Sequence, residues 1–86
     1  MKRGIKEYAH SLHPDPHKVK VSLTQEGLNY ADELRGSGTL GAILTYLSQY
    51  APKSIAQIAE GTDPKLEIRV VRRNLRAFPE YFVERE

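Results

Sequence analysis

One pattern limits the fold more than any other: a run of apolar residues at helical spacing, enclosed between a glycine-rich break and a proline. Gly36-Ser37-Gly38 precedes the run and Pro52 follows it, so the pattern predicts a helix over Thr39–Tyr50. The apolar residues of the run are Leu40, Ile43, Leu44 and Leu47, with Ala51 directly after the predicted helix. The chain has 86 residues and no cysteine, which excludes disulfides and Cys-based zinc sites as supports for a small core. We therefore expect a single domain over 1–86 whose core surrounds this helix.

The segment 5–23 is predicted to form a β-hairpin. Polar and apolar side chains alternate over 18–23, as in a half-buried strand, and His13–His17 is a proline-rich stretch typical of a turn. The partner strand is expected within Ile5–Leu12, where the apolar spacing fits a helix as well. Thr24 is a good N-cap and starts an accessory helix over Gln25–Arg35, in which Leu28, Ala31 and Leu34 share one side.

Beyond Pro52 the sequence predicts two further helices and a strand. Ser54 can cap a short helix over Ser54–Glu60, and Gly61 breaks the chain after it. Asp63 can then cap a helix over Lys65–Ala77, because Pro64 suits its first position, where a missing N–H costs nothing. The residues Tyr81–Arg85 are a strand candidate that would pair with the hairpin in a small antiparallel sheet.

Basic residues are concentrated in two segments, although the net charge is only +2. Residues 1–23 hold five basic and two acidic residues, and residues 65–76 hold five and one. On the last predicted helix one stripe is apolar, with Ile68, Val71, Leu75 and Phe78, and another is basic, with Arg69, Arg72, Arg73 and Arg76. Such guanidinium groups repel one another unless an anion lies across them, and arginine suits both phosphate oxygens and the guanine edge. The bland alternative is a solvated helix face with local pairs to Glu67.

Thr39–Phe82 resembles a winged helix-turn-helix DNA-binding domain. The sequences IAEGT at 58–62 and VVRRNL at 70–75 are similar to the I-A-x-x-T and V-R-R-x-L spacings of such domains. The resemblance implies an α+β fold with three to four helices and a small antiparallel sheet. In it, 39–86 is the helix-turn-helix plus strand, and Lys65–Ala77 is the recognition helix that enters the major groove.

A second resemblance lies upstream. Residues 15–27, DPHKVKVSLTQEG, resemble the wing and the following helix of MarR-type transcriptional regulators. Asp15, Leu23, Thr24 and Gly27 are in register with the D-x-R and L-T-x-x-G patterns of that family, and His17 stands at the arginine position. Here the segment precedes the helix-turn-helix, whereas in that family the wing follows it. The resemblance implies a wing that touches the DNA backbone.

These patterns predict sequence-dependent binding of double-stranded DNA by a transcriptional regulator. The predicted contacts are Lys65, Arg69, Arg72, Arg73 and Arg76 on the recognition helix, and His17, Lys18 and Lys20 on the wing. Arg69 and Arg73 are expected to reach base edges. Because one copy presents one recognition helix, a homodimer through the Gln25–Arg35 helix would read two half-sites. The alternative is a winged-helix protein-interaction module, an adaptor or complex subunit whose basic face meets an acidic partner.

Other chemistry has less support in the sequence. His10, His13 and His17 with Asp15 suggest a metal site, but a loop with two prolines does not easily bring three imidazoles together, so no metal is expected. No cofactor motif and no catalytic arrangement can be assembled, and we do not expect an enzyme. No apolar run approaches the roughly 20 residues that cross a bilayer, so we expect a cytoplasmic protein without membrane contact.

Overall fold

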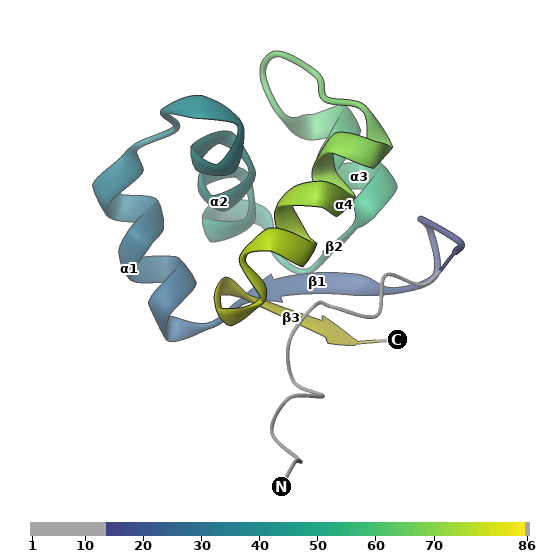
Figure 1. Ribbon diagram of the computed structural model, residues 1–86, viewed down its shortest axis with the longest axis horizontal. Helices are drawn as coiled ribbons and strands as arrows, with labels where there is room; N and C mark the ends of the chain where they lie inside the picture. The colour runs from purple at the N-terminus through teal and green to yellow at the C-terminus, as the bar shows by residue number, and fades with distance from the viewer. Residues whose placement is uncertain (1–13, 86) are drawn as a thin grey trace, which may run out of the picture.

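The computed structural model describes residues 14–85. In chain order its elements are β1 (Lys20–Leu23), α1 (Gln25–Leu34), α2 (Gly38–Tyr50), β2 (Lys53–Ser54), α3 (Ile55–Gly61), α4 (Ile68–Ala77), the 3-10 turn η2 (Pro79–Tyr81) and β3 (Phe82–Arg85). The described residues thus form an α+β fold with four helices and a three-stranded antiparallel sheet (Figure 1). This confirms the expected class and number of helices.

The sheet joins parts of the chain that are far apart in sequence. β1 is the middle strand, with β2 on one edge and β3 on the other, both antiparallel to it. Lys20 lies opposite Arg85 and Leu23 lies opposite Phe82, so the start of β1 meets the end of β3 (Figure 1). The expected pairing of the last strand with the strand of 18–23 is confirmed. The partner strand expected within Ile5–Leu12 lies outside the described residues.

The core surrounds α2, as the apolar pattern predicted. Ile43, Leu44 and Leu47 are buried on its inner side. They belong to one cluster with side chains of the sheet and of the other helices, including Val21, Ala31, Ile55, Ile58, Val71, Leu75 and Phe82. Burying one side chain of this size stabilises a fold by about 1.5–3 kcal/mol, so this single cluster holds the helices on the sheet.

The three apolar residues that share one side of α1 differ in burial. Ala31 is buried and Leu34 is half-buried, but Leu28 is 42% exposed. Gly27 is the buried residue of the first turn instead. Because Gly27 has no Cβ, α1 lies directly against the backbone carbonyl of Tyr81, and Leu28, one position further around the helix, turns outward.

α4 begins at Ile68, three residues after the predicted start at Lys65, which is a correction. The backbone N–H of Leu66 donates to the carbonyl of Ala59 at 3.0 Å, and this bond holds the connecting segment in a non-helical path. Glu67 is the N-cap, and its carbonyl accepts from the N–H groups one turn later, at Val70 and Val71. Asp63 and Pro64 therefore lie in the loop, where they neither cap nor start the helix.

A compact junction ties the start of α1 to η2 and β3. The Thr24 hydroxyl accepts from the Gly27 N–H at 3.1 Å and donates to the Glu80 carbonyl at 2.7 Å. The Thr24 N–H donates to the Tyr81 carbonyl at 3.0 Å. We call Thr24, Gly27, Glu80 and Tyr81 the Thr24 junction. Packing between the start of α1 and η2 thus explains the residues that resemble the L-T-x-x-G motif.

Candidate nucleic-acid interface

α4 presents one buried face and one basic face. Val71 and Leu75 are fully buried, while Ile68 is 38% exposed and Phe78 is half-buried, so the inward stripe is narrower than predicted. The four arginines of the helix line one shallow hollow of about 340 Å³ on the other side: Arg69, Arg72, Arg73 and Arg76. We call these four residues the arginine surface. The structure therefore brings together the residues of the predicted basic stripe.

The members of this surface differ in what they contact. Arg69 Nε lies 2.9 Å from Glu67 Oε1. This is the local ion pair expected if the basic stripe is only a solvated helix face. Both side chains are largely exposed, at 81% and 68%, and such a pair is worth at most about 1 kcal/mol, so an anionic ligand can displace it. The side chains of Arg73 and Arg76 are exposed and form no hydrogen bond or ion pair with any other residue in 14–85.

Arg72 is held by the fold. Its Nη2 donates to the backbone carbonyl of Pro14 at 2.8 Å, across 58 positions of sequence, and its Nε is buried without a hydrogen-bond partner in the described part of the chain, 14–85. This guanidinium therefore positions the segment that leads into β1 as well as adding charge to the helix. Sequence reasoning missed this role, because no local pattern links Arg72 to Pro14.

The other predicted contacts form two separate groups. Lys65 lies in the loop before α4, and its Nζ is 3.2 Å from Glu60 Oε1. His17 and Lys18 are exposed in the turn before β1, where their backbone N–H groups donate to Asp15, at 2.9 Å to its carboxylate and at 3.2 Å to its carbonyl. Lys20 is exposed at the start of β1.

The turn that was expected to project as a wing is tied to the helices. The carbonyl of Pro16 accepts from the N–H of Ala56 in α3 at 3.1 Å, and the carbonyl of Pro14 accepts from Arg72 in α4. Residues 14–19 therefore lie beside α3 and α4, at the same end of the sheet as the start of β1 (Figure 1). His13, the first residue of the predicted tip, lies outside the described residues.

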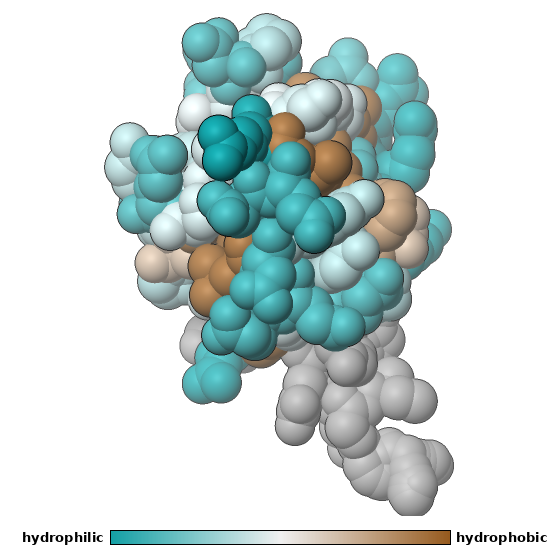
Figure 2. Space-filling view, turned by 90° about the vertical axis from the view of Figure 1, so that its left-hand side faces the viewer, coloured by the Kyte–Doolittle hydropathy of each residue, from teal (hydrophilic) through white to brown (hydrophobic). Residues whose placement is uncertain are grey.

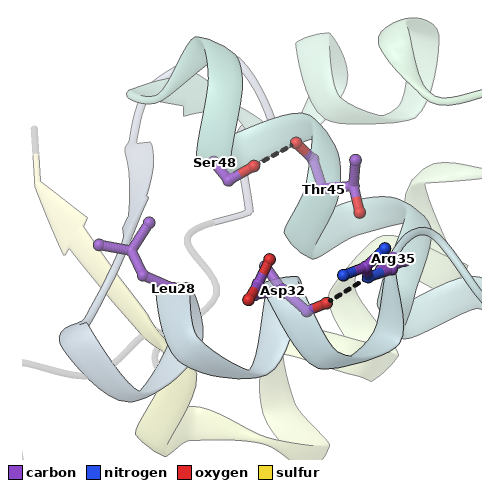
Figure 3. Close-up of a pocket in the computed structure, with 6 residues that line it drawn as sticks. Leu28, Asp32, Arg35, Thr45 and Ser48 are labelled. Carbon is purple, nitrogen blue, oxygen red and sulfur yellow. Dashed lines mark hydrogen bonds between the residues drawn. The ribbon is translucent and has the colours of Figure 1, made fainter.

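A second hollow, of about 270 Å³, lies between α1 and α2. It is lined by Leu28, Ala31, Asp32, Arg35, Thr45 and Ser48 (Figure 3). Its polar groups bond mainly within their own helices: Arg35 Nε donates to the Asp32 carbonyl at 3.3 Å, and Ser48 Oγ donates to the Thr45 carbonyl at 2.7 Å. Thr45 Oγ1 is buried and has no hydrogen-bond partner among residues 14–85.

The face of the molecule on the α1 side, the expected dimer contact, is mostly hydrophilic, with small apolar areas separated by polar side chains (Figure 2). Leu28 is the large apolar residue that α1 exposes. Within 14–85 no group of three His, Asp or Glu side chains is placed to hold a metal ion. His10 and His13, two of the histidines considered as ligands, lie outside those residues. None of the helices that the structure describes has the length and apolar character needed to span a membrane.

Comparison of the chain with protein-family models, with curated proteins and with solved structures gave no match.

Proposed function

We propose that this protein binds double-stranded DNA through the arginine surface, with α3 and α4 acting as a helix-turn-helix. The observation that carries the proposal is the unpartnered charge of Arg73 and Arg76 beside Arg69 and Arg72 on one exposed helix face. Within a row of like charges each guanidinium raises the free energy of its neighbours, and a phosphate backbone laid across the row removes this cost. Arginine also offers a fork that fits guanine O6 and N7.

In this proposal the domain is a winged helix-turn-helix in which β1 and its lead-in act as the wing. Support comes from position: Arg72 of α4 contacts Pro14, so the turn that carries His17 and Lys18 lies beside the proposed recognition helix, and Lys20 follows it at the start of β1. These cations would bind phosphates and set the orientation of the duplex, while α4 would read base edges. Lys65, which lies in the loop before α4 and is paired with Glu60, would contribute through a phosphate near the start of the helix.

Among the arginines, Arg73 is the best candidate for a base contact. Arg69 lies nearer the start of α4, where residues usually enter the major groove most deeply, but it must first leave Glu67. Arg73 is one turn further along, exposed and without a partner in the described residues. A homodimer through α1 would place two such helices on two half-sites, and light scattering at high micromolar concentration tests it.

The decisive experiment is duplex affinity as a function of salt for the Arg69→Ala, Arg73→Ala and Arg76→Ala variants. A phosphate contact should lower the salt slope by about one unit when removed, and a base contact should cost roughly 1–3 kcal/mol of discrimination between sequences. Gln49→Ala is the control: it changes an exposed side chain of α2 that belongs neither to the proposed DNA contacts nor to the proposed dimer contact.

Unchanged binding in all three α4 variants, with normal melting curves, would refute DNA binding by this surface. The protein-interaction alternative would then take its place: the same arginines would meet an acidic partner protein. A requirement of the arginines for capture of such a partner, in a chain that does not bind duplex DNA at low salt, would support that alternative.

A further inference from the structure

A second basic site lies on the sheet, away from α4. In the β1–β3 ladder Lys20 lies directly opposite Arg85, and Ser22 lies opposite Val83. Directly opposed residues of an antiparallel pair point to the same face, and alternate residues of a strand share that face. Val21 and Phe82, the intervening residues, are fully buried in the core. Lys20, Ser22, Val83 and Arg85 therefore lie on the outer face of the sheet.

The two cations of this face have no internal partner. Lys20 and Arg85 are exposed, and neither forms a hydrogen bond or ion pair through its side chain with another residue in 14–85. Glu84, the acid before Arg85, lies opposite Val21 and so belongs to the inner face. Like charges directly opposite one another in a ladder are destabilising, so this pair lowers the stability of the sheet unless an anion lies between them.

The shape beside the pair leaves room for such an anion. A hollow of about 400 Å³ is lined by Lys20, Ser22, Leu23, Pro52, Val83 and Arg85. The hollow thus combines two cationic donors and one hydroxyl donor with an apolar floor. A phosphate group offers the oxygen acceptors that an ammonium, a guanidinium and a hydroxyl can share.

We propose that Lys20, Arg85 and Ser22 form a phosphate-binding site that extends the nucleic-acid surface from α4 onto the sheet. The proposal rests on the proposed function, since it gives the phosphate a source in the DNA backbone. The start of β1 is connected to α4 through the contact of Arg72 with Pro14, so one duplex can follow the arginine surface, the turn at 14–19 and the end of the sheet. Arg85 is thus a proposed phosphate contact, although the sequence of its strand showed no functional pattern.

The test compares Lys20→Gln, Arg85→Gln and the double variant with Arg73→Ala in duplex titrations at several salt concentrations. Each sheet variant should weaken every duplex by the same factor, roughly five- to tenfold at about 0.1 M salt, and should lower the salt slope by about one unit. The double variant should lose about two units. Gln49→Ala is again the control, and it should bind as the wild type does.

The outcomes separate the two proposals. If Arg73→Ala weakens binding but both sheet variants bind like the wild type, the sheet site is refuted and the function of α4 stands. If the wild type binds no duplex, the proposed function fails, and the sheet site is judged with inorganic pyrophosphate by NMR. Amide shifts at Lys20, Ser22 and Arg85 that vanish in Arg85→Gln would retain a phosphate site there, and their absence would overturn it.

Discussion

The Thr24 junction and the arginine surface both contain residues that resemble motifs of known DNA-binding regulators. They differ in whether their polar side chains have partners within the fold. In the junction, the Thr24 hydroxyl and N–H have partners within the fold. The Tyr81 carbonyl occupies the space that a side chain at Gly27 would need. On the arginine surface, Arg73 and Arg76 are left without partners among residues 14–85. A motif whose groups satisfy one another is explained by the fold alone. The unpartnered charges of the arginine surface are not explained in this way, and the proposal of DNA binding rests on them.

The largest effect on the Thr24 junction is expected from a side chain added at Gly27. An added Cβ would collide with the Tyr81 carbonyl oxygen and lie 3.3 Å from the Leu23 Cβ, and both atoms are fixed by the sheet and η2. Gly27→Ala should therefore lower the free energy of unfolding by about 2–3 kcal/mol, as overpacking does. Urea unfolding measures this change.

A matched glycine provides the control for this experiment. Gly38 has φ 73°, and a Cβ there would meet nothing within 4 Å. Gly38→Ala should cost only the backbone penalty, about 1 kcal/mol. Equal stability of Gly27→Ala and the wild type would contradict the close approach of α1 to Tyr81.

The hydroxyl of Thr24 is the next test of the junction. Thr24→Val keeps the shape but removes the cap of α1 and the bond to the Glu80 carbonyl, so it should cost about 1–2 kcal/mol in urea unfolding. Thr24→Ser retains the hydroxyl and should recover most of this loss. If valine and serine behave alike, the stabilising role assigned to the two hydroxyl bonds is wrong.

Arg72 combines the two situations, because it belongs to the arginine surface and its side chain is hydrogen-bonded within the fold. Arg72→Ala should lower the free energy of unfolding by about 1 kcal/mol, because the bond to Pro14 is lost. Removal of the buried Nε, which has no partner among residues 14–85, offsets part of this loss. Arg73→Ala should stay within about 0.5 kcal/mol of the wild type. The direct measurement is amide hydrogen exchange at His17 and Lys18, which should quicken in Arg72→Ala alone. Equal exchange in the two variants would show that Arg72 does not hold the turn.

The sequence was sufficient where local patterns decide the structure. The apolar run of α2, the caps Thr24 and Ser54, and the alternation of β1 all predicted elements that the structure contains. It was insufficient where a distant contact decides. Leu28 turns outward because Gly27 meets Tyr81, and α4 starts at Ile68 because Leu66 bonds to Ala59. For the same reason the helical spacing grouped the arginines correctly, but only the fold separates Arg72 from Arg73 and brings Arg85 beside Lys20.

The smallest expected effect concerns the Tyr81 phenol in the junction. Partial burial raises its pKa above the ordinary value of about 10, and Tyr30, Glu80, Glu26 and Glu33 add to the shift in that order. Because the unfolded chain releases this proton at lower pH than the folded chain, the contribution is intact below about pH 10 and is lost as the pH rises through the folded pKa. Tyr81→Phe removes the titrating group. Its melting temperature should therefore fall less between pH 9 and pH 11 than that of the wild type. Parallel falls in melting temperature in the two proteins would show that Tyr81 ionises as readily in the folded chain as in the unfolded one. The ring would then contribute to the junction only through its contacts with Tyr30 and Phe78, at centroid distances of 5.0 and 5.9 Å.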